Sequence, residues 1–424
     1  MLLRVNKSRV KGSVKIPGSK SHTIRSLFIA SLADGRSLIK DPLVSNDALS
    51  AADVCRALGA KIELSSQGFV VEGFNGKPCV PSDVVDVGNS GTTINFGVMT
   101  AALVNGTSVF TGDYQIRSRP IGPLIEAINR LGAQAYSTRN NGIPPVVVKG
   151  RIEGGVTELD SVTSQYLSSI LINAPLFDKD TEVLLTRLYE VPYVEITMWW
   201  LDKQGIEYKN NDFKSFHIKG GQSYKPLDTR IPGDFSSATF FAVQAAISGE
   251  ELILNNLDMS DPQGDKLVLS ILEDMGASIN VGKDSVVIKG KGLKGREIDM
   301  NSIPDALPAM AVAGCFAEGE TRLVNVTQAR LKETDRIMVM CRELGKMGAD
   351  IRELEDGLVI RRSKLKGCRV NGCSDHRVVM ALAVAGLNIE NKTIIDTAEA
   401  VNVTFPEFVS IMSECGGDIA FFEE

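Results

Sequence analysis

The sequence predicts a mixed α/β chain of two domains, built from six copies of one α+β unit with three copies in each domain. Two observations support this prediction: the length of 424 residues and a short tag that recurs six times. A chain of this length exceeds what a single hydrophobic core normally holds. The composition, 43% hydrophobic and 23% charged, is ordinary for a globular protein with well-filled cores.

The recurring tag is a helical stretch followed by a glycine and a strand-like stretch. It reads LGAKIEL from Leu58, LGAQAYS from Leu131 and MGADIRE from Met347. Apolar residues at helical spacing precede the glycine, which suits a left-handed helix C-cap before a strand. One such junction is common in α/β proteins, but six at nearly even spacing indicate a repeat. The tag glycines lie 68 to 73 residues apart, at Gly59, Gly132, Gly205, Gly276, Gly348 and Gly416.

Two turn-prone segments are candidates for the passage of the chain between the domains. Arg230-Ile-Pro-Gly-Asp234 lies between the third and fourth tags, and Pro17-Gly18 lies near the start. We therefore expect one discontinuous domain of residues 1–18 and 231–424, and a second domain of residues 19–230.

Charge and cysteine usage exclude several classes of protein. The formal net charge of -6 argues against a nucleic-acid or polybasic membrane surface, so local groups of Lys and Arg must bind any anionic ligand. The seven cysteines form no C-x-x-C pair, which favours reduced thiols in a cytoplasmic protein. The three histidines lack metal-ligand neighbours, so no metal site is expected. The start lacks the apolar run of a signal peptide, and the apolar stretch 306–317 is too short to span a membrane.

Four segments of the first half carry groups suited to small anions. Pro17-Gly-Ser-Lys-Ser21 precedes a helical stretch with an apolar face, with Ser21 as the expected N-cap one turn before Arg25. The second segment is Gly88-Asn-Ser-Gly-Thr-Thr93, whose glycines allow the backbone to come close to an anion. Arg119, just before a helix that starts with a proline, suits a bidentate clamp. Ser161-Val-Thr-Ser-Gln165 offers hydroxyl and amide groups at a helix start. Each segment also has a commoner explanation, as a solvated loop, a turn, a surface arginine or a helix cap.

The densest group of charges is Arg330-Leu-Lys-Glu-Thr-Asp-Arg336, directly before an apolar helical stretch. On a helix, Lys332 and Arg336 would lie one turn apart with Glu333 alongside. Together with Asp305 upstream and Asp375-His-Arg377 downstream, they form a set of acids and cations suited to proton transfer on an anionic substrate. A solvated, charged helix start is the structural alternative.

In this order, the segments P-G-S-K-S, G-N-S-G-T, R-P-I-G, S-V-T-S-Q, I-P-D-A, R-L-K-E-T-D-R and D-H-R resemble the EPSP synthase family of enolpyruvyl transferases over essentially the whole chain. The resemblance implies a two-domain inside-out α/β fold built from six βαβαββ repeats and joined by two crossing strands. It also implies transfer of the enolpyruvyl group of phosphoenolpyruvate to the 5-hydroxyl of shikimate 3-phosphate, with release of phosphate, in the biosynthesis of chorismate and the aromatic amino acids. No cofactor is implied, and the family is commonly monomeric.

The same resemblance assigns roles to residues. Asp305 is implied as the base on the attacking hydroxyl, with Lys332 beside it, and Glu333 as the acid that protonates the methylene carbon. Closure of the domains would exclude water from the reaction. The residues implied to bind phosphoenolpyruvate are Lys20, Gly91, Arg119, Gln165, Arg336 and Arg377. Those implied to bind the acceptor are Ser21 and Arg25 at its carboxylate, and Thr163, Ser164, Gln165 and Tyr193 at its phosphate and ring.

Four positions depart from the family pattern. Glu190 stands where a serine is usual and would repel a bound phosphate; Asn95 and Val403 replace an arginine and a lysine; Gln328, which we still expect near the substrates, replaces an asparagine or histidine. A paralogue that acts on another, unphosphorylated cyclic alcohol therefore stays open. The related UDP-N-acetylglucosamine enolpyruvyl transferase is disfavoured because residues 111–118 contain no cysteine. A non-catalytic binding protein is disfavoured because binding alone would not require Asp305 and Glu333.

Overall fold

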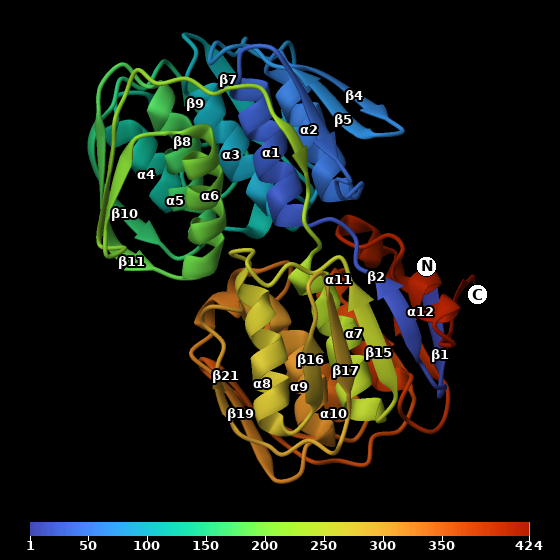
Figure 1. Ribbon diagram of the computed structural model, residues 1–424. Helices are drawn as coiled ribbons and strands as arrows, with labels where there is room; N and C mark the ends of the chain where they lie inside the picture. Colours follow the sequence, from blue (N-terminus) through green and yellow to red (C-terminus); the bar gives the residue numbers. More distant parts are fainter. Residues whose placement is uncertain (424) are drawn as a thin grey trace. The chain divides into compact units, whose positions relative to one another are not determined.

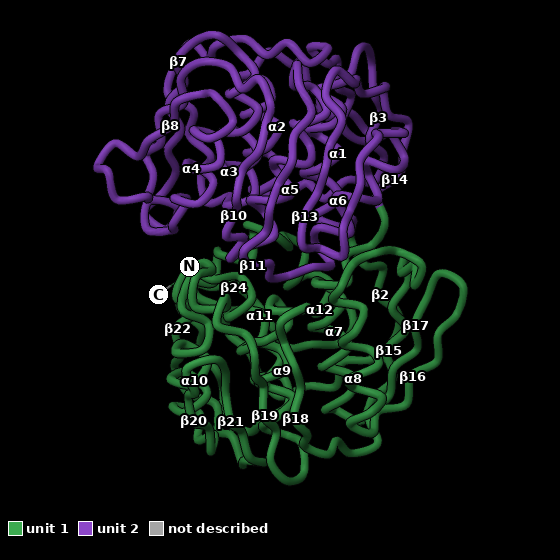
Figure 2. Tube along the Cα trace, turned by 90° about the vertical axis from the view of Figure 1, so that its left-hand side faces the viewer, with its two compact units in different colours: residues 1–17, 232–424 green, residues 18–231 purple. Residues whose placement is uncertain are grey.

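The computed structural model describes residues 1–423 and divides the chain into two compact units. Unit 1 consists of residues 1–17 and 232–424, and unit 2 of residues 18–231 (Figure 2). The chain passes from unit 1 to unit 2 after Pro17 and returns after Ile231. The boundaries expected from the sequence lie one residue away from each of these two points.

Unit 2 contains three sheets and six α-helices, with the helices at its centre (Figure 1). The inner helices are buried almost all round, and the outer helices bury one face. The inner helices are α1 (Lys20–Leu32), α3 (Gly91–Ala101) and α5 (Ser164–Asn173), and the outer ones are α2 (Asn46–Ala57), α4 (Gly122–Arg130) and α6 (Val191–Gln204). The strands are β3 (Arg36–Lys40), β4 (Lys61–Ser65), β5 (Gly68–Glu72), β6 (Val85–Asp86), β7 (Thr107–Thr111), β8 (Gln134–Ser137), β9 (Val146–Lys149), β10 (Gly155–Ser161), β11 (Thr181–Leu188), β12 (Tyr208–Asn211), β13 (Ser215–Ile218) and β14 (Asp228–Arg230).

Unit 1 repeats this plan. Its inner helices are α7 (Phe235–Ser248), α9 (Leu307–Phe316) and α11 (His376–Gly386), and its outer helices are α8 (Leu267–Met275), α10 (Arg336–Lys346) and α12 (Phe408–Glu414). Its strands are β1 (Leu2–Asn6), β2 (Gly12–Lys15), β15 (Glu251–Asn255), β16 (Ser278–Val281), β17 (Ser285–Lys289), β18 (Glu297–Asp299), β19 (Glu320–Val324), β20 (Asp350–Leu354), β21 (Gly357–Arg361), β22 (Arg369–Asn371), β23 (Thr393–Asp396) and β24 (Asp418–Phe422).

All six four-stranded sheets have the same topology, which confirms the predicted sixfold repeat. In the sheet β6-β7-β9-β8, the first two strands are parallel, and β9 then pairs antiparallel with both β7 and β8. The other five sheets follow the same pattern of one parallel pair and two antiparallel pairs.

Strands β2 and β14 each pair within one unit, although the helix that follows each of them in the chain belongs to the other unit. Strand β2 comes directly before α1 of unit 2, yet it pairs in parallel with β15 of unit 1, with Ser13 beside Ile253. Strand β14 comes before α7 of unit 1, yet it pairs with β3 of unit 2, with Thr229 beside Ile39. The two chain ends also share a sheet, because β1 pairs antiparallel with β24.

The six tag glycines confirm the expected helix–glycine–strand junctions. Each follows an outer helix and precedes a strand, and their φ angles lie between 70° and 116°. Only glycine adopts this region without a steric penalty from Cβ. The chain therefore turns from helix to strand at the same place in every repeat.

Helix α1 differs from its sequence-based description as a helix with one apolar face. Residues 22–32 are all buried, including the polar Thr23, Arg25 and Ser31. The reason is that α1 packs against α2, α3 and α6 as well as strands β3 and β5. A helix enclosed on every side buries its polar residues too, and Ser31 accordingly donates to the carbonyl of Leu27 at 2.7 Å. Among the described residues, every helix is too short or too polar to cross a membrane.

Candidate functional site

In unit 2, the predicted lysine lies at the very start of α1. Lys20 is the first residue of this helix, and its Nζ lies 3.1 Å from Oδ2 of Asp47. Both side chains are largely shielded, with exposures of 16% and 6%. The expectation that Ser21 caps the helix is wrong, because the helix begins at Lys20 and Ser19 occupies the cap position. Asp47 was missed from the sequence, since nothing in its own segment points to Lys20.

Arg25 donates four hydrogen bonds inside unit 2. They run from Nε to Thr197 Oγ1 at 2.8 Å, from Nη1 to the Ser21 carbonyl at 3.0 Å, and from Nη2 to the Tyr193 carbonyl at 2.9 Å and to Ser168 Oγ at 3.4 Å. Only 2% of the residue is exposed. Burial lowers the pKa of Arg25 to about 10, and Tyr193 acts in the opposite direction. Arg25 therefore joins α1 to α5 and α6, and a direct contact with a ligand carboxylate stays a prediction.

The start of α3 brings together three residues predicted to bind the donor. A Cβ atom on Gly91 would lie 2.8 Å from Nη1 of Arg119 and 3.6 Å from Oε1 of Gln165. Asn95 joins this group, because its Nδ2 donates to the carbonyl of Gly91 at 2.9 Å and to Oε1 of Gln165 at 2.8 Å. The residue that replaces the family's arginine thus positions Gln165.

The segment that carries Arg119 is attached to α5. Tyr166 of this helix donates from its hydroxyl to the carbonyl of Pro120 at 2.6 Å. Burial raises the pKa of Tyr166 well above its usual value, and Asp160 and Glu190 act in the same direction, so the phenol stays protonated and able to donate. Helix α4 begins only at Gly122, so Arg119 lies further from the helix than the sequence suggested.

The start of α5 holds a carboxylate from the chain itself. Oε2 of Glu190 accepts hydrogen bonds from Ser164 Oγ at 2.8 Å, from the Ser164 N–H at 3.2 Å and from Thr163 Oγ1 at 3.2 Å. Glu190 is 1% exposed and stands at the N-cap position of α6. Tyr193 lies in the first turn of that helix and is partly buried. The hydroxyls predicted to bind a phosphate therefore bind Glu190 in this structure.

In unit 1, the predicted acids and cations meet at Asp305, just before α9. Oδ1 of Asp305 accepts from Nη1 of Arg336 at 2.8 Å and lies 4.0 Å from Nζ of Lys332. Oδ2 lies 2.9 Å from Nη2 of Arg377, the second residue of α11. One carboxylate therefore contacts three cations, while its own side chain is 15% exposed.

Arg336 is the centre of this cluster. Besides Asp305, it donates from Nη2 to Oε2 of Glu333 at 2.5 Å and from Nε to Oδ2 of Asp375 at 2.8 Å. Burial by itself lowers the pKa of Arg336, but Asp375, Glu333 and Asp305 outweigh that effect and raise it above its usual value. Asp375 is fully buried and also accepts from the N–H groups of Arg377 and Val378 at the start of α11. The sequence indicated Asp375 only through its place beside Arg377.

The secondary structure around Lys332 and Glu333 corrects the sequence-based expectation. Residues 327–331 form a 3-10 helix, η5 (Thr327–Leu331), and α10 begins only at Arg336. Lys332 and Glu333 thus lie in an irregular segment between the two helices. Glu333 meets Arg336 through a local contact three residues along the chain, whereas Lys332 meets Asp305 through a tertiary contact.

Two of the departures from the family pattern lie in unit 1. Gln328 is 3% exposed, and its Nε2 donates to the carbonyl of Asn301 at 3.1 Å. Val403 is the last residue of a 3-10 helix, η6 (Ala398–Val403), and is partly buried. The valine brings no positive charge to this place.

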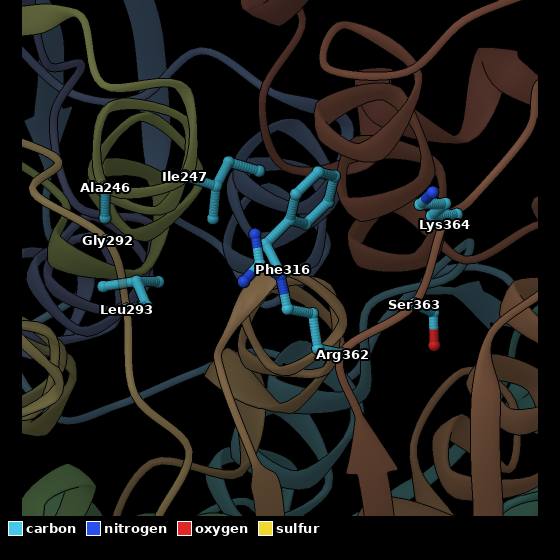
Figure 3. A pocket seen from close by; sticks show the side chains of 8 residues that line it. All are labelled: Ala246, Ile247, Gly292, Leu293, Phe316, Arg362, Ser363 and Lys364. Atoms are coloured by element: carbon cyan, nitrogen blue, oxygen red, sulfur yellow. The ribbon is translucent and has the colours of Figure 1, made fainter.

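Unit 1 also contains a pocket of 480 Å³, whose lining residues Figure 3 shows. It is bordered by Ala246 and Ile247 near the end of α7 and by Phe316 at the end of α9. Asp305 and Arg377, by contrast, belong to the N-terminal ends of α9 and α11. The remaining lining residues are Gly292, Leu293, Arg362, Ser363 and Lys364.

Comparisons with known proteins identify the family of the chain. The chain matches the EPSP synthase (3-phosphoshikimate 1-carboxyvinyltransferase) family over residues 5–412. It is 71% identical to a 3-phosphoshikimate 1-carboxyvinyltransferase from Acetivibrio thermocellus and 43% identical to one from Methanocaldococcus jannaschii, covering 99% or more of both chains in each comparison. A solved EPSP synthase from Acinetobacter baumannii has a TM-score of 0.83 at 27% identity, over 100% of both chains. This chain belongs to the EPSP synthase family.

Proposed function

We propose that the residues at the helix starts of unit 2 and the cluster around Asp305 in unit 1 take part in the reaction of the family: transfer of the enolpyruvyl group of phosphoenolpyruvate to the 5-hydroxyl of shikimate 3-phosphate, with release of phosphate. The observation that carries this proposal is the cluster around Asp305. It places two partly exposed carboxylates, Asp305 and Glu333, on one buried guanidinium, Arg336. An acid and a base held beside fixed cations suit proton transfer on an anionic substrate.

The reaction requires two proton transfers before phosphate leaves. Glu333 gives a proton to the methylene carbon of phosphoenolpyruvate, and the neighbouring carbon becomes an oxocarbenium-like centre. The 5-hydroxyl attacks this centre and gives its proton to Asp305, with Lys332 beside that carboxylate. The leaving phosphate then takes the proton held by Asp305, and the new methyl group returns one proton to Glu333, which restores the double bond. Both carboxyl groups thus end in the protonation state in which they began.

The proposal assigns residues of both units to the two anionic substrates. We assign the donor to Lys20, Gly91, Arg119 and Gln165 of unit 2 and to Arg336 and Arg377 of unit 1. We assign the acceptor to Ser21, Arg25, Thr163, Ser164, Gln165 and Tyr193, with Gln328 as a further contact. Because groups of both units act on the same substrates, the proposal requires the units to close during turnover and to exclude water. A monomeric state and a cytoplasmic location stay predictions.

Phosphate release tests the proposed function. The purified protein is incubated with phosphoenolpyruvate and either shikimate 3-phosphate or shikimate, and free phosphate is followed with time. Release is expected with shikimate 3-phosphate and is expected to disappear in Asp305→Asn. Release with shikimate alone would identify a paralogue that acts on an unphosphorylated alcohol. If no phosphate is released with any acceptor, the result would favour a non-catalytic binding protein.

A further inference from the structure

Glu190 combines a left-handed backbone conformation with a buried carboxylate, and both are unfavourable for a glutamate. Its φ and ψ are 59° and 42°, a left-handed conformation that costs a non-glycine residue conformational energy. Its side chain is almost completely buried between α5 and α6, two helices that pack against each other (Figure 1). A buried carboxylate is retained only where hydrogen bonds replace its hydration. For Glu190 those bonds come from Thr163 and Ser164.

These hydrogen bonds place the carboxylate where a helix attracts anions. The Ser164 N–H is the first of α5, and the N-terminal end of a helix carries a partial positive charge. The hydroxyls of Thr163 and Ser164 complete a set of three donors around a single oxygen, Oε2. Glu190 therefore occupies this anion position with a charge that belongs to the chain.

The proposed function assigns the same donors to the phosphate group of the acceptor. Three donors that surround a carboxylate oxygen cannot also surround a phosphate oxygen, and two anions side by side in a shielded place repel each other. Binding of a phosphorylated acceptor must therefore displace the Glu190 carboxylate from Thr163 and Ser164.

We propose that Glu190 is a built-in competitor for the acceptor's phosphate group and thereby sets the specificity for the acceptor. The proposal rests on the proposed function. In the absence of acceptor, Glu190 holds the donors of α5; when shikimate 3-phosphate binds, its side chain leaves them. The cost of this exchange weakens binding of the phosphorylated acceptor, whereas an acceptor without phosphate does not require the exchange. The protein thus discriminates less between the two acceptors than it would with a neutral residue at this position.

A charge-neutral variant of the same shape tests the proposal. Glu190→Gln keeps the length of the side chain but removes the charge that competes with phosphate. We expect shikimate 3-phosphate and inorganic phosphate to bind about tenfold more tightly to this variant in calorimetric titrations. The affinity for shikimate and the KM for phosphoenolpyruvate should stay unchanged. Glu195→Gln is the matched control, because Glu195 is an exposed residue of the same helix.

The selectivity of the effect separates competition from a purely structural role. If Glu190 only joins α5 to α6, its replacement should weaken both acceptors alike and lower the melting temperature. Unchanged or weaker binding of shikimate 3-phosphate to a folded Glu190→Gln variant would overturn the proposal. Binding of inorganic phosphate needs no turnover, so the outcome is independent of whether the protein catalyses the proposed reaction.

A structure of the wild-type protein with shikimate 3-phosphate provides a second measurement that needs no variant. We expect the Glu190 carboxylate to have left the Ser164 N–H and both hydroxyls in that complex. Retention of all three hydrogen bonds beside a bound phosphate group would contradict the competition.

Discussion

The two units share one repeat but begin their inner helices with different residues. In unit 1, Asp234 caps α7, Asp375 caps α11, and Asp305 lies two residues before α9. In unit 2, the corresponding positions of α1, α3 and α5 hold Ser19, Ser90 and Thr163. Carboxylates compensate the positive end of a helix with an internal charge, whereas neutral hydroxyls leave that charge to an external anion.

This difference corresponds to different chemistry in the two units. The carboxylates of unit 1 attract Arg336, Arg377 and Lys332, and the result is a cluster of acids and cations suited to proton transfer. Unit 2 offers cations and hydroxyls suited to binding. Two carboxylates are exceptions within unit 2: Glu190 lies at the start of α5, and Asp47 pairs with Lys20 at the start of α1. Four predictions test this contrast between the residues of unit 1 and those of unit 2.

The largest effect is expected at the acid cluster of unit 1. Asp305→Asn removes the proposed base and one partner of Arg336, and we expect kcat to fall by about 10³-fold, since general base catalysis contributes on this scale. Steady-state phosphate release at saturating substrates measures kcat. Asp350→Asn, at an exposed position of the same unit, serves as the control and should keep its activity. A kcat close to that of the wild type would exclude Asp305 as the base.

The next prediction compares the N-cap positions of α11 and α3, where the Asp375 carboxylate accepts capping hydrogen bonds and the Ser90 hydroxyl makes none. Asp375→Asn neutralises the most deeply buried of the three carboxylates that contact Arg336 and weakens the start of α11, so the free energy of unfolding should fall by about 3 kcal/mol. Ser90→Ala at the start of α3 should cost about 1 kcal/mol or less. Urea denaturation of both variants measures these losses. Equal losses would show that the two kinds of cap are energetically equivalent.

A smaller effect is expected at the start of α1 in unit 2. Lys20→Met removes the ammonium group that we assign to the donor, so kcat/KM for phosphoenolpyruvate should fall by about 100-fold. The melting temperature should also fall, because the largely shielded Asp47 carboxylate loses the ammonium group 3.1 Å away. Lys61→Met, at an exposed lysine of the same unit, is the control. Loss of stability without loss of kcat/KM would assign Lys20 a structural role instead.

The smallest effect concerns Glu343 on α10, a buried carboxylate of unit 1 outside the catalytic cluster. Burial by itself raises the pKa of Glu343, but hydrogen bonds from Lys346, the Asn371 N–H and Arg342 outweigh it and lower the pKa below its usual value. Because the folded-state pKa is lowered, the ionised group stabilises the protein above the unfolded-state pKa of about 4.3. This contribution is lost as the pH falls through the folded-state pKa.

Glu343→Gln should therefore reduce the free energy of unfolding by about 1 to 2 kcal/mol at pH 7. The difference from the wild type should shrink below about pH 4, as the wild-type carboxylate becomes protonated. Urea denaturation at both pH values measures this, with the exposed Glu355→Gln as the control. A difference that persists unchanged at low pH would show that the charge of Glu343 is not the source of its stabilisation.

Local patterns predicted the parts of the structure that depend on local physics. The tag glycines end an outer helix in all six repeats, because a left-handed C-cap favours glycine wherever the chain turns from helix to strand. The helix starts at Gly91 and Ser164 also followed from their own segments. Ser21 as a cap and the helical placement of Lys332 and Glu333 were wrong, because flanking polar residues do not fix the first residue of a helix.

The sequence by itself thus determined the sixfold repeat, the position of each motif at or near a helix start and the family to which the chain is similar. The tertiary structure alone decided that β2 pairs with β15 of unit 1 and that β14 pairs with β3 of unit 2, since a strand's own residues do not specify its distant partner. It also decided the contacts of Asp47 with Lys20, of Asp375 with Arg336 and of Glu190 with Ser164. Each of these pairs is separated by 26 to 39 residues, and contacts over such distances leave no periodic signal in the sequence.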